Sequence, residues 1–328
     1  MKIAVLGAGA WGTAIGISLA SRHTVALWVR DPAQHAIVQS TRRNERYLPG
    51  FALPDKLVPT SDFDAAIGGC ELVLLAVTTA GLRETLRRLR TARSTVPVVW
   101  LCKGFERQHA KLPHQVCAEE LGTGTRCGVL SGPSFAQEVA RGLPTAVTLA
   151  AADSGFARDA AQQLHGTTLR VYSSDDVVGV EVAGAVKNVI AIAAGICDGL
   201  GLGLNARAAL ITRGLAEMTR LGVKLGGRPE TFMGLAGAGD LILTCTGDLS
   251  RNRRVGLKLA QGTQLSEILA DLGHIAEGVY SAREVARIAA AQRVDMPITD
   301  VVCRVLDGEI AAAAAVEALL QREPKPEY

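Results

Sequence analysis

Three glycines near the start of the chain stand at a spacing that serves one kind of chemistry. Residues 7–12 read Gly-Ala-Gly-Ala-Trp-Gly and follow the apolar run 2–6 directly. Gly7 permits a tight turn out of a strand, Gly9 leaves room for a pyrophosphate, and Gly12 lets a helix pack closely. The pyrophosphate would lie on the free N–H groups at the start of that helix. The pattern therefore predicts a dinucleotide cofactor and hydride transfer.

Charged residues after the second strand-like run bear on which dinucleotide is used. In such sites an acid at the end of the second strand binds the ribose of NAD, whereas an arginine pairs with the 2′-phosphate of NADP. Here Arg30 precedes Asp31, and Arg42, Arg43 and Arg46 follow. We expect NADPH to be preferred, with NADH as the alternative cofactor. The competing interpretation is that Arg30 is only a solvated charge at a strand end.

Two lysines are placed where they could take part in hydride chemistry. Lys103 follows the apolar run 96–101, and ligands of open parallel sheets bind beyond the carboxyl ends of the strands. Lys187 is a single charge within the apolar run 182–190, where burial would lower its pKa and suit it to proton transfer. The alternative is a structural lysine whose stem covers the core. Asn188 points about 100° away from Lys187 on a helix and would hold backbone or cofactor amide groups.

Two further segments offer polar groups to a ligand. Residues 131–136 (Ser-Gly-Pro-Ser-Phe-Ala) provide backbone N–H groups and two hydroxyls just past a predicted strand. Residues 237–241 (Gly-Ala-Gly-Asp-Leu) lack the third glycine of a dinucleotide loop and predict a turn that presents Asp240. Thr244, four residues later, would share the face of Asp240 if that stretch is helical.

A basic segment follows at residues 250–254 and is suited to hold an anion. Ser250 favours the position that caps a helix beginning near Arg251. The planar guanidinium of Arg251 and the amide of Asn252 would then donate to phosphate oxygens beside the helix start. The alternative is a solvated basic face, and Arg253 and Arg254 stay unassigned.

The elements that must position these residues alternate along the first half of the chain. Apolar runs separated by helix-like runs predict parallel strand–helix–strand units in a doubly wound sheet covered on both faces. We expect strands at residues 3–6, 25–29, 72–76, 96–101 and 128–130, and helices at 13–21, 32–40, 81–91 and 112–121. Two later runs, 145–150 and 169–172, would extend the sheet in an antiparallel sense.

From about residue 177 the strand signals end and helices rich in Ala and Leu follow. They are expected at residues 180–194, 206–221, 255–261, 265–272, 282–291, 298–306 and 310–320. The fold class predicted for the chain is α/β, with a Rossmann-type doubly wound sheet followed by an all-helical domain. We expect the dinucleotide-binding domain over residues 1–176 and an all-α substrate and catalytic domain over 177–328.

Composition argues against several functional classes. The 328 residues carry a net charge of only +3 without a long basic run, which argues against nucleic-acid binding. The 7 cysteines form no C-x-x-C pair and the 6 histidines lack ligand spacing, so no metal site is expected. The longest apolar region, 182–211, holds charges and many glycines, which favours a buried helical region over a membrane span. We expect a cytoplasmic protein without stable membrane insertion.

The glycine fingerprint and four motifs together resemble the NAD(P)-dependent glycerol-3-phosphate dehydrogenases in their bacterial form. The motifs are Lys-Gly-Phe-Glu at 103–106, Gly-Pro-Ser-Phe-Ala at 132–136, Val-Lys-Asn-Val at 186–189 and Gly-Ala-Gly-Asp-Leu at 237–241. Their order and spacing match over essentially the whole chain. The resemblance implies the reversible reduction of dihydroxyacetone phosphate to sn-glycerol 3-phosphate by a homodimer. The product would serve as the backbone of membrane phospholipids.

The resemblance also implies roles for residues at matching positions. Lys187 would donate and accept the proton, Lys103 would contact both cofactor and substrate, and Asp240 would orient the amine of Lys187. Lys187 and Asp240 would also contact the substrate. Further substrate contacts would be Gly132, Ser134, Ser250, Arg251 and Asn252, to which we add Asn188 and Thr244 from their spacing. Further cofactor contacts would be Trp11, Arg30, Ala136, Arg251, Ile275 and Glu277. His274 lies near this last pair and has no role assigned.

One departure from the family pattern lies in the glycine loop itself. Ala10 stands where many relatives carry serine. Backbone N–H groups of Gly7, Gly9, Ala10 and Gly12 can still hold the pyrophosphate, so the change removes one neutral hydrogen bond, worth about 1 kcal/mol.

Two other functions fit the same architecture. A 3-hydroxyacid dehydrogenase would need a carboxylate anchor in place of a phosphate anchor. A non-catalytic redox sensor that binds NAD(P)H would need no proton donor, so Lys187 and Asp240 argue against it. Assays of candidate substrates with NADPH would separate the three.

Overall fold

The computed structural model describes residues 1–107, 109–272 and 276–323. The chain divides into two compact units, one of Met1–Glu106 with Lys111–Glu181 and one of Arg107–Ala110 with Val182–Tyr328. The predicted domain boundary after residue 176 falls just before helix α8 (Val177–Gly199), whose first turn belongs to the first unit. As a boundary between functional domains it stays a prediction.

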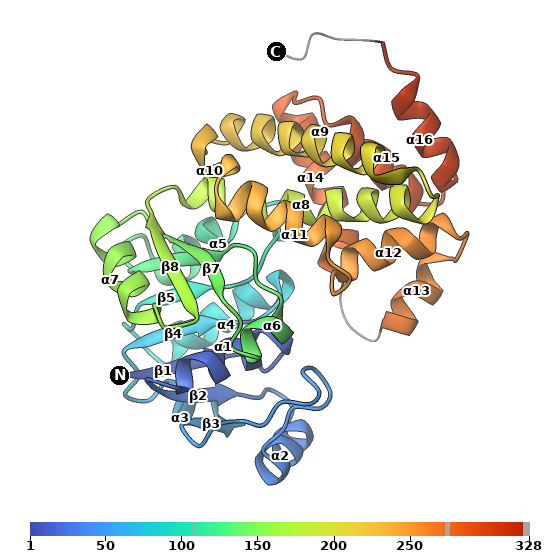
Figure 1. Cartoon of the computed structure of the whole chain (residues 1–328). Coiled ribbons are helices and arrows are strands. Elements are labelled where there is room, and N and C mark those ends of the chain that lie inside the picture. Colours follow the sequence, from blue (N-terminus) through green and yellow to red (C-terminus); the bar gives the residue numbers. More distant parts are fainter. Residues whose placement is uncertain (108, 273–275, 324–328) are drawn as a thin grey trace. The chain divides into compact units, whose positions relative to one another are not determined.

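The first unit is built on one eight-stranded sheet in the order β3-β2-β1-β4-β5-β6-β7-β8 (Figure 1). The strands are β1 (Lys2–Leu6), β2 (Thr24–Trp28), β3 (Leu57–Thr60), β4 (Leu72–Leu75), β5 (Val98–Trp100), β6 (Cys127–Ser131), β7 (Thr145–Ala150) and β8 (Leu169–Ser174). The first six run parallel, β7 is antiparallel to β6, and β8 is parallel to β7. The predicted doubly wound sheet and its antiparallel extension are confirmed. The strand order reverses at β1, which is where such sheets bind nucleotides.

Strand β3 is the strand that the sequence pattern does not predict. It has four residues, includes Pro59, and forms the edge of the sheet beside β2. Proline removes a donor from the ladder, and a sheet tolerates that loss at its edge. A short proline-bearing run therefore becomes a strand only because β2 offers it a partner.

Helices cover both faces of this sheet. They are α1 (Ala10–Ala20), α2 (Pro32–Thr41), α3 (Phe63–Ile67), α4 (Thr79–Thr91), α5 (Pro113–Leu121), α6 (Ala136–Ala140) and α7 (Ser154–Leu164). Ile15 of α1 and Phe156 of α7 join one apolar cluster with alternate strand residues such as Val5. On the opposite face, Trp28 meets Phe63 of α3 edge-on, with ring centroids 5.3 Å apart. The alternation of strand side chains thus fills two separate core layers.

The second unit is helical throughout its described elements. Its helices are α8, α9 (Gly203–Lys224), α10 (Pro229–Met233), η1 (Leu235–Gly239), α11 (Asp240–Thr246), α12 (Arg251–Ala260), α13 (Leu265–Leu272), α14 (Glu277–Gln292), α15 (Pro297–Leu306) and α16 (Ala312–Leu320). Helix α8 is long and apolar enough to cross a membrane, but 89% of its most apolar window is buried within the protein. That burial is typical of a core helix, as the sequence predicts.

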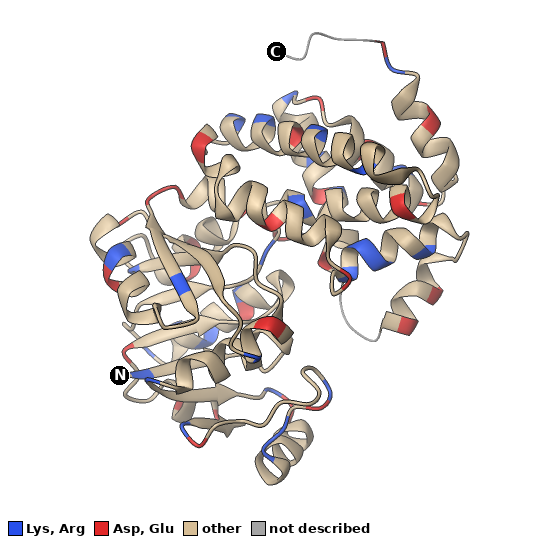
Figure 2. Ribbon diagram, in the orientation of Figure 1, with Lys and Arg blue, Asp and Glu red and all other residues tan. Residues whose placement is uncertain are grey.

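Helices α8 and α12 pack with their backbones in direct contact. A Cβ on Gly195 of α8 would lie 2.0 Å from the carbonyl oxygen of Arg253, and one on Gly256 of α12 would lie 2.0 Å from that of Ile192. Two facing glycines are therefore needed for this close approach. Figure 2 shows acidic and basic residues interspersed along the helices of this unit and over the elements of the first.

Candidate active site

The glycine loop after β1 forms a cradle suited to a pyrophosphate. Gly7 has a φ of +119°, and a Cβ on Gly12 would lie 2.0 Å from the carbonyl oxygen of Gly7. A Cβ on Gly9, by contrast, would meet no described atom within 4 Å. Gly9 caps α1 without a side-chain hydrogen bond, so the N–H groups at the helix start remain available to an anion. The residues present fit a dinucleotide cofactor.

A buried amide that the sequence analysis did not single out holds this loop in shape. The Nδ2 atom of Asn44 donates to the carbonyl of Ala8 at 2.9 Å and to the hydroxyl of Thr13 at 2.8 Å. Its Oδ1 atom accepts from Gln34 at 3.1 Å, and Asn44 has no exposed surface. In the sequence, the sole signal is one uncharged residue in the charged run 42–46, which does not indicate burial.

The charges predicted near the adenosine ribose separate into structural and available groups. Gly7 N donates to Trp28 O at 3.2 Å, which joins the end of β2 to the glycine loop. Asp31 accepts a backbone hydrogen bond at 3.0 Å and caps α2. Arg42 donates to two loop carbonyls. Arg30 is exposed just past β2, and its guanidinium has no partner among the described residues.

Two apolar residues expected at the cofactor site rest on a common cluster. Trp11 of α1 and Ala136, the first residue of α6, both pack against the buried residues Ala14, Leu48 and Val139. Ala10 is the first residue of α1. Helices α1 and α6 therefore bring Trp11 and Ala136, which are distant in sequence, against one apolar cluster.

Lys103 and the segment after β6 meet at the carboxyl edge of the sheet. Lys103 follows β5 and Gly132 follows β6, and these strands are paired neighbours. The Nζ atom of Lys103 donates to the carbonyl of Gly132 at 3.3 Å, and Ser134 Oγ donates to the same oxygen at 2.9 Å. Gly132 has a φ of +141°, which favours glycine. Parallel pairing thus gathers these three residues where ligands of such sheets bind.

In the second unit, Lys187 is buried against an acid. Its Nζ atom lies 2.5 Å from Oδ1 of Asp240 and donates to Oγ1 of Thr244 at 2.9 Å. Thr244 in turn donates to the carbonyl of Asp240 at 2.6 Å, one helical turn before it. The side chain of Lys187 is 8% exposed. Burial raises the pKa of neighbouring Cys245 to about 12, so this thiol stays protonated.

The glycines before Asp240 form a π-helical turn that runs directly into α11. A Cβ on Gly237 would lie 2.1 Å from the carbonyl oxygen of Phe232, so this position has no room for a side chain. The segment presents Asp240 as expected, although it is helical and not a β-turn. Extra-wide turns of this kind are frequent at functional sites.

Asn188 and Asn252 are joined by their side chains. The Nδ2 atom of Asn252 donates to Oδ1 of Asn188 at 2.9 Å, and Gly278 N donates to Oδ1 of Asn252 at 3.0 Å. Asn188 also donates to the carbonyl of Gly184 at 3.3 Å. Both amides are buried, and they tie α8, α12 and the start of α14 together. Glu277 is the first residue of α14.

The arginines after Ser250 have different environments. Ser250 Oγ accepts from Arg253 N at 3.2 Å, which confirms that Ser250 caps α12. The Arg253 guanidinium binds Asp198 at 2.7 Å and Asp248 at 2.9 Å. Arg251 is exposed at the first position of α12, and no described residue pairs with its guanidinium. Arg251 therefore remains available to a ligand, whereas Arg253 holds the helix.

The first turn of α8 is anchored by a second pair that the sequence analysis did not assign. Glu181 accepts from the backbone N of His114 at 2.9 Å and lies 2.5 Å from its ring Nδ1. Burial raises the pKa of Glu181. Burial is the largest single influence on the pKa of His114 and lowers it, but the hydrogen bond to Glu181 and the charge of that carboxylate together raise the net pKa. These two contacts join Glu181 of α8 to the start of α5.

The predicted site residues thus form two sets, one in each unit. Lys103, Gly132 and Ser134 meet in the first, and Lys187, Asp240 and Thr244 meet in the second. Ile275 and His274 lie outside the described residues. Within the described part of the chain, no group of His, Cys, Asp and Glu side chains is arranged to hold a metal ion.

Comparisons with known proteins match both units. Residues 2–157 match the model of the NAD-dependent glycerol-3-phosphate dehydrogenase N-terminus, and residues 176–317 match that of the C-terminus. The glycerol-3-phosphate dehydrogenase [NAD(P)+] of Dechloromonas aromatica is 60% identical over 327 residues, covering 100% of this chain and 99% of the relative. That of Nitrosospira multiformis is 61% identical over 331 residues, with the same coverage. The crystal structure of glycerol-3-phosphate dehydrogenase from Coxiella burnetii superposes with a TM-score of 0.94 at 44% identity, covering 98% of this chain and 99% of that one.

Proposed function

The chain belongs to the NAD-dependent glycerol-3-phosphate dehydrogenase family, and we propose that it reversibly reduces dihydroxyacetone phosphate to sn-glycerol 3-phosphate with NAD(P)H. The observation that carries the proposal is the buried Lys187 amine held by Asp240 and Thr244. A lysine whose stem only covers the core, the alternative considered from the sequence, would direct its amine to solvent. Here the amine has a fixed direction, which general acid–base catalysis requires.

The reaction adds a hydride to the carbonyl carbon and a proton to the carbonyl oxygen. The glycine loop after β1 would hold the reduced nicotinamide dinucleotide, which would supply the hydride when bound. The Lys187 ammonium stabilises the negative charge that develops on the oxygen and donates the proton, which yields the alcohol. In the reverse direction, the neutral amine accepts the proton of the substrate hydroxyl. Asp240 and Thr244 orient the amine, and Lys103 contributes a second positive charge to substrate and cofactor.

The phosphate group of the substrate is assigned to Arg251 and the start of α12. The guanidinium of Arg251, which no described residue pairs with, and the N–H groups of a ten-residue helix both suit a phosphate dianion. Asn252 and Asn188 contribute to this subsite mainly by holding α12 against α8, because their side chains hydrogen-bond to each other and to the backbone. Ser250, Gly132 and Ser134 complete the assigned substrate contacts.

NADPH is the preferred cofactor in this proposal. Arg30 is available to a 2′-phosphate, whereas Asp31, the acid that would otherwise bind the ribose hydroxyls, caps α2. The remaining cofactor contacts are the glycine loop with Ala10, Trp11, Ala136 and Lys103 in the first unit, and Arg251, Ile275 and Glu277 in the second.

The enzyme is further proposed to be a cytoplasmic homodimer whose product enters phospholipid synthesis. Helices of the second unit expose large apolar side chains, among them Leu204, Met233 and Ile242. Exposed apolar side chains of this size are common at interfaces between subunits. Sedimentation equilibrium over a range of protein concentrations measures the mass of the assembly and tests the dimer.

The test of the activity is a spectrophotometric assay of NADPH oxidation with dihydroxyacetone phosphate. We expect saturable turnover with this ketone, faster than with NADH, and none with carboxylate ketones such as 3-oxoacids. Turnover of the carboxylate compounds alone would indicate a hydroxyacid dehydrogenase. Tight NADPH binding by folded protein without turnover of either class would indicate a sensor.

A further inference from the structure

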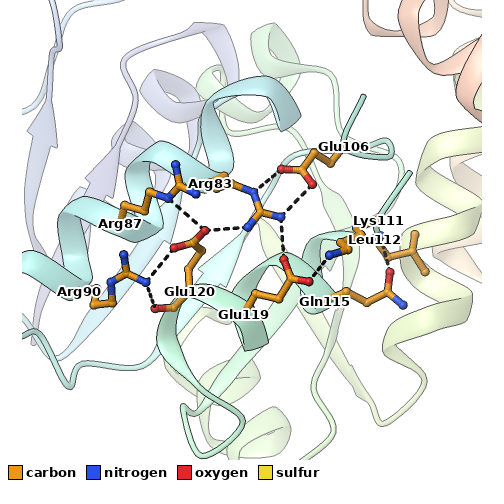
Figure 3. A network of polar contacts seen from close by, with 9 residues as sticks. All are labelled: Arg83, Arg87, Arg90, Glu106, Lys111, Leu112, Gln115, Glu119 and Glu120. Carbon is orange, nitrogen blue, oxygen red and sulfur yellow. Dashed lines mark hydrogen bonds and ion pairs between the residues drawn. The ribbon is translucent and has the colours of Figure 1, made fainter. Parts of the chain in front are cut away.

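Within the described part of the first unit, three carboxylates surround the guanidinium of Arg83 (Figure 3). The side chain of Arg83 is 18% exposed. Its Nε and Nη2 atoms donate to the two oxygens of Glu106 at 2.5 and 2.9 Å. It also donates to Glu119 at 2.8 Å and to Glu120 at 2.7 Å. Hydrogen bonding to Glu106 is the largest cause that raises the pKa of Arg83 above its ordinary value.

The three carboxylates come from two different segments, and Arg83 comes from a third. Arg83 lies on α4, Glu119 and Glu120 lie at the end of α5, and Glu106 lies within the loop that follows β5. Figure 3 shows the carboxylates converging on the single guanidinium. The planar fork matches the Glu106 carboxylate at two points, so it fixes the orientation of this side chain as well as its position.

The loop fixed in this way carries Lys103. Between Lys103 and Glu106, Gly104 has a φ of +140° and Phe105 is buried. The segment is short and held at both ends, by the bond of Lys103 to Gly132 and by the fork of Arg83. A shift of Glu106 would therefore be transmitted to the Lys103 amine.

Arg83 is also linked, through Glu119, to Lys111, the residue at which the chain returns to the first unit after Glu106. Glu106 N donates to the carbonyl of Lys111 at 2.9 Å. The Lys111 ammonium pairs with Glu119, which Arg83 binds as well. The residues between them, Arg107–Ala110, belong to the second unit. One guanidinium is thus connected to both points at which this segment leaves and re-enters the first unit.

We infer that Arg83 is a positioning residue that holds Lys103 in its working place through the Glu106 carboxylate. The inference rests on the proposed function, because it takes Lys103 as a contact of substrate and cofactor. Its distinguishing consequence is that the loss of Arg83 acts on turnover through Lys103. A contribution to stability alone would act on unfolding and leave turnover by the folded enzyme unchanged.

The same cluster provides a matched control. Arg87 lies on the same face of α4 and binds Glu120 at 3.1 Å, and its side chain is 57% exposed. Among the described contacts, it reaches Glu120 and not Glu106. The substitution R87Q removes one arginine from the cluster and leaves the Glu106 fork intact. R83K retains the charge of Arg83 and removes the fork, and E106Q removes the charge from the other partner.

The test compares kcat/KM for dihydroxyacetone phosphate in the full-length variants at saturating NADPH. We expect R83K and E106Q to lower it by about 10- to 100-fold, and R87Q by less than about twofold. In a K103A background, R83K should cause no further loss, because the group that it positions is already absent. The inference would be overturned if R83K lowered kcat/KM no more than R87Q does. It would also be overturned if R83K lowered kcat/KM as much in the K103A background as in the wild type.

A second measurement separates this inference from the proposed function. Hydrogen exchange of backbone amides 101–106 should be faster in R83K than in R87Q, whichever ketone is reduced. If hydrogen exchange of these amides in R83K is no faster than in R87Q, the inference that Arg83 positions Lys103 is overturned. An inactive wild-type enzyme overturns the proposed function. Faster exchange in R83K would in that case still support the inference that Arg83 holds this loop in place. Should R83K fail to fold, E106Q carries both comparisons, because it keeps the shape of the side chain that it replaces.

Discussion

The Nζ atom of Lys187 lies 2.5 Å from Oδ1 of Asp240, although 53 residues separate them in the chain. The pair is almost fully buried, and Thr244 provides the amine with a second partner at 2.9 Å. A buried charge is tolerated only when it is paired and hydrogen-bonded, so each member of the pair fixes the other. This relationship is the basis on which we propose Lys187 as the proton donor and acceptor.

Removal of the Lys187 amine should abolish most turnover without loss of cofactor binding. We expect K187A to lower kcat by about 100- to 10,000-fold, because the proton donor is lost. Its Kd for NADPH, measured by fluorescence titration, should stay within about threefold of the wild type, since the glycine loop lies in the other unit. T244V, which removes one hydrogen bond to the amine, is the control and should have a smaller effect. A K187A enzyme with wild-type turnover would contradict the assignment.

Arg251 and Arg253 should differ in what they support. R251Q should raise KM for dihydroxyacetone phosphate by about 10- to 100-fold, because a charged hydrogen bond to phosphate is lost, and should leave the melting temperature unchanged. R253Q should lower the free energy of unfolding by about 1–3 kcal/mol, because Asp198 loses a partner at 2.7 Å. Steady-state kinetics and urea unfolding of both variants measure the contrast. A larger KM effect in R253Q than in R251Q would reverse the assignment.

Gly9 and Gly12 should also respond differently to the same methyl group. G12A should destabilise the fold by about 2 kcal/mol or more, because its Cβ would lie 2.0 Å from the Gly7 carbonyl oxygen. G9A should fold normally, since its Cβ meets no described atom within 4 Å and its φ of −73° is ordinary. It should nevertheless weaken NADPH binding by about tenfold, because the methyl group occupies the cradle. Thermal unfolding and NADPH titration distinguish the two.

Arg30 should determine the choice between the two cofactors. R30Q should lower kcat/KM with NADPH by about tenfold and leave that with NADH nearly unchanged, because only NADPH carries the 2′-phosphate. R43Q, which removes an exposed arginine paired with Glu45 at 3.5 Å, is the control. Equal losses with both cofactors in R30Q would show that Arg30 does not read the 2′-phosphate.

Glu217 should make the stability of the second unit depend on pH. Its carboxylate accepts from the backbone N of Ile298 at 2.6 Å and of Thr299 at 3.2 Å at the start of α15. Burial raises its pKa from 4.5 to about 7. The folded state therefore binds a proton that the unfolded chain releases between these values. The contribution to stability is fully present below pH 4.5 and is lost as the pH rises through about 7.

The corresponding change in the free energy of unfolding is about 3 kcal/mol across that range. Urea unfolding of the wild type and of E217Q, well below and well above pH 7, measures it. E217Q should remove this component, because the amide carries no charge at any pH. The prediction would be contradicted if the free energy of unfolding changed with pH in the same way in the wild type and in E217Q.

The dinucleotide cradle was predictable because its parts are adjacent in the chain. The turn needs a glycine at position 7, the open backbone one at 9 and the close helix contact one at 12. The spacing of Gly7, Gly9 and Gly12 therefore predicts the geometry of the loop. The alternation of apolar runs likewise predicted a doubly wound sheet. It did not predict β3, because a short run with Pro59 lacks a strand pattern and depends on β2 for its hydrogen bonds. The order of the strands and the antiparallel β7 determine which loops share an edge.

The groups that orient the predicted residues could not be read from the chain. Asn44 and Glu106 are ordinary surface residue types, and their roles arise from partners far away in the sequence. Residues 251, 253 and 254 are all arginines, so residue type does not distinguish them. The ion pairs with Asp198 and Asp248 set Arg253 apart. Motifs of adjacent residues indicate the local chemistry. Which partners a side chain contacts depends on the whole fold.

By itself, the order of residues determined the fold class, the cofactor loop and the candidate lysines, since each depends on neighbours in the chain. The tertiary structure alone decided that Lys187 contacts Asp240, that no described residue pairs with the Arg251 guanidinium, and that Arg83 binds Glu106. The physical reason is that a hydrogen bond or ion pair forms between atoms brought together in space. Packing of helices and strands sets those distances, and sequence separation does not.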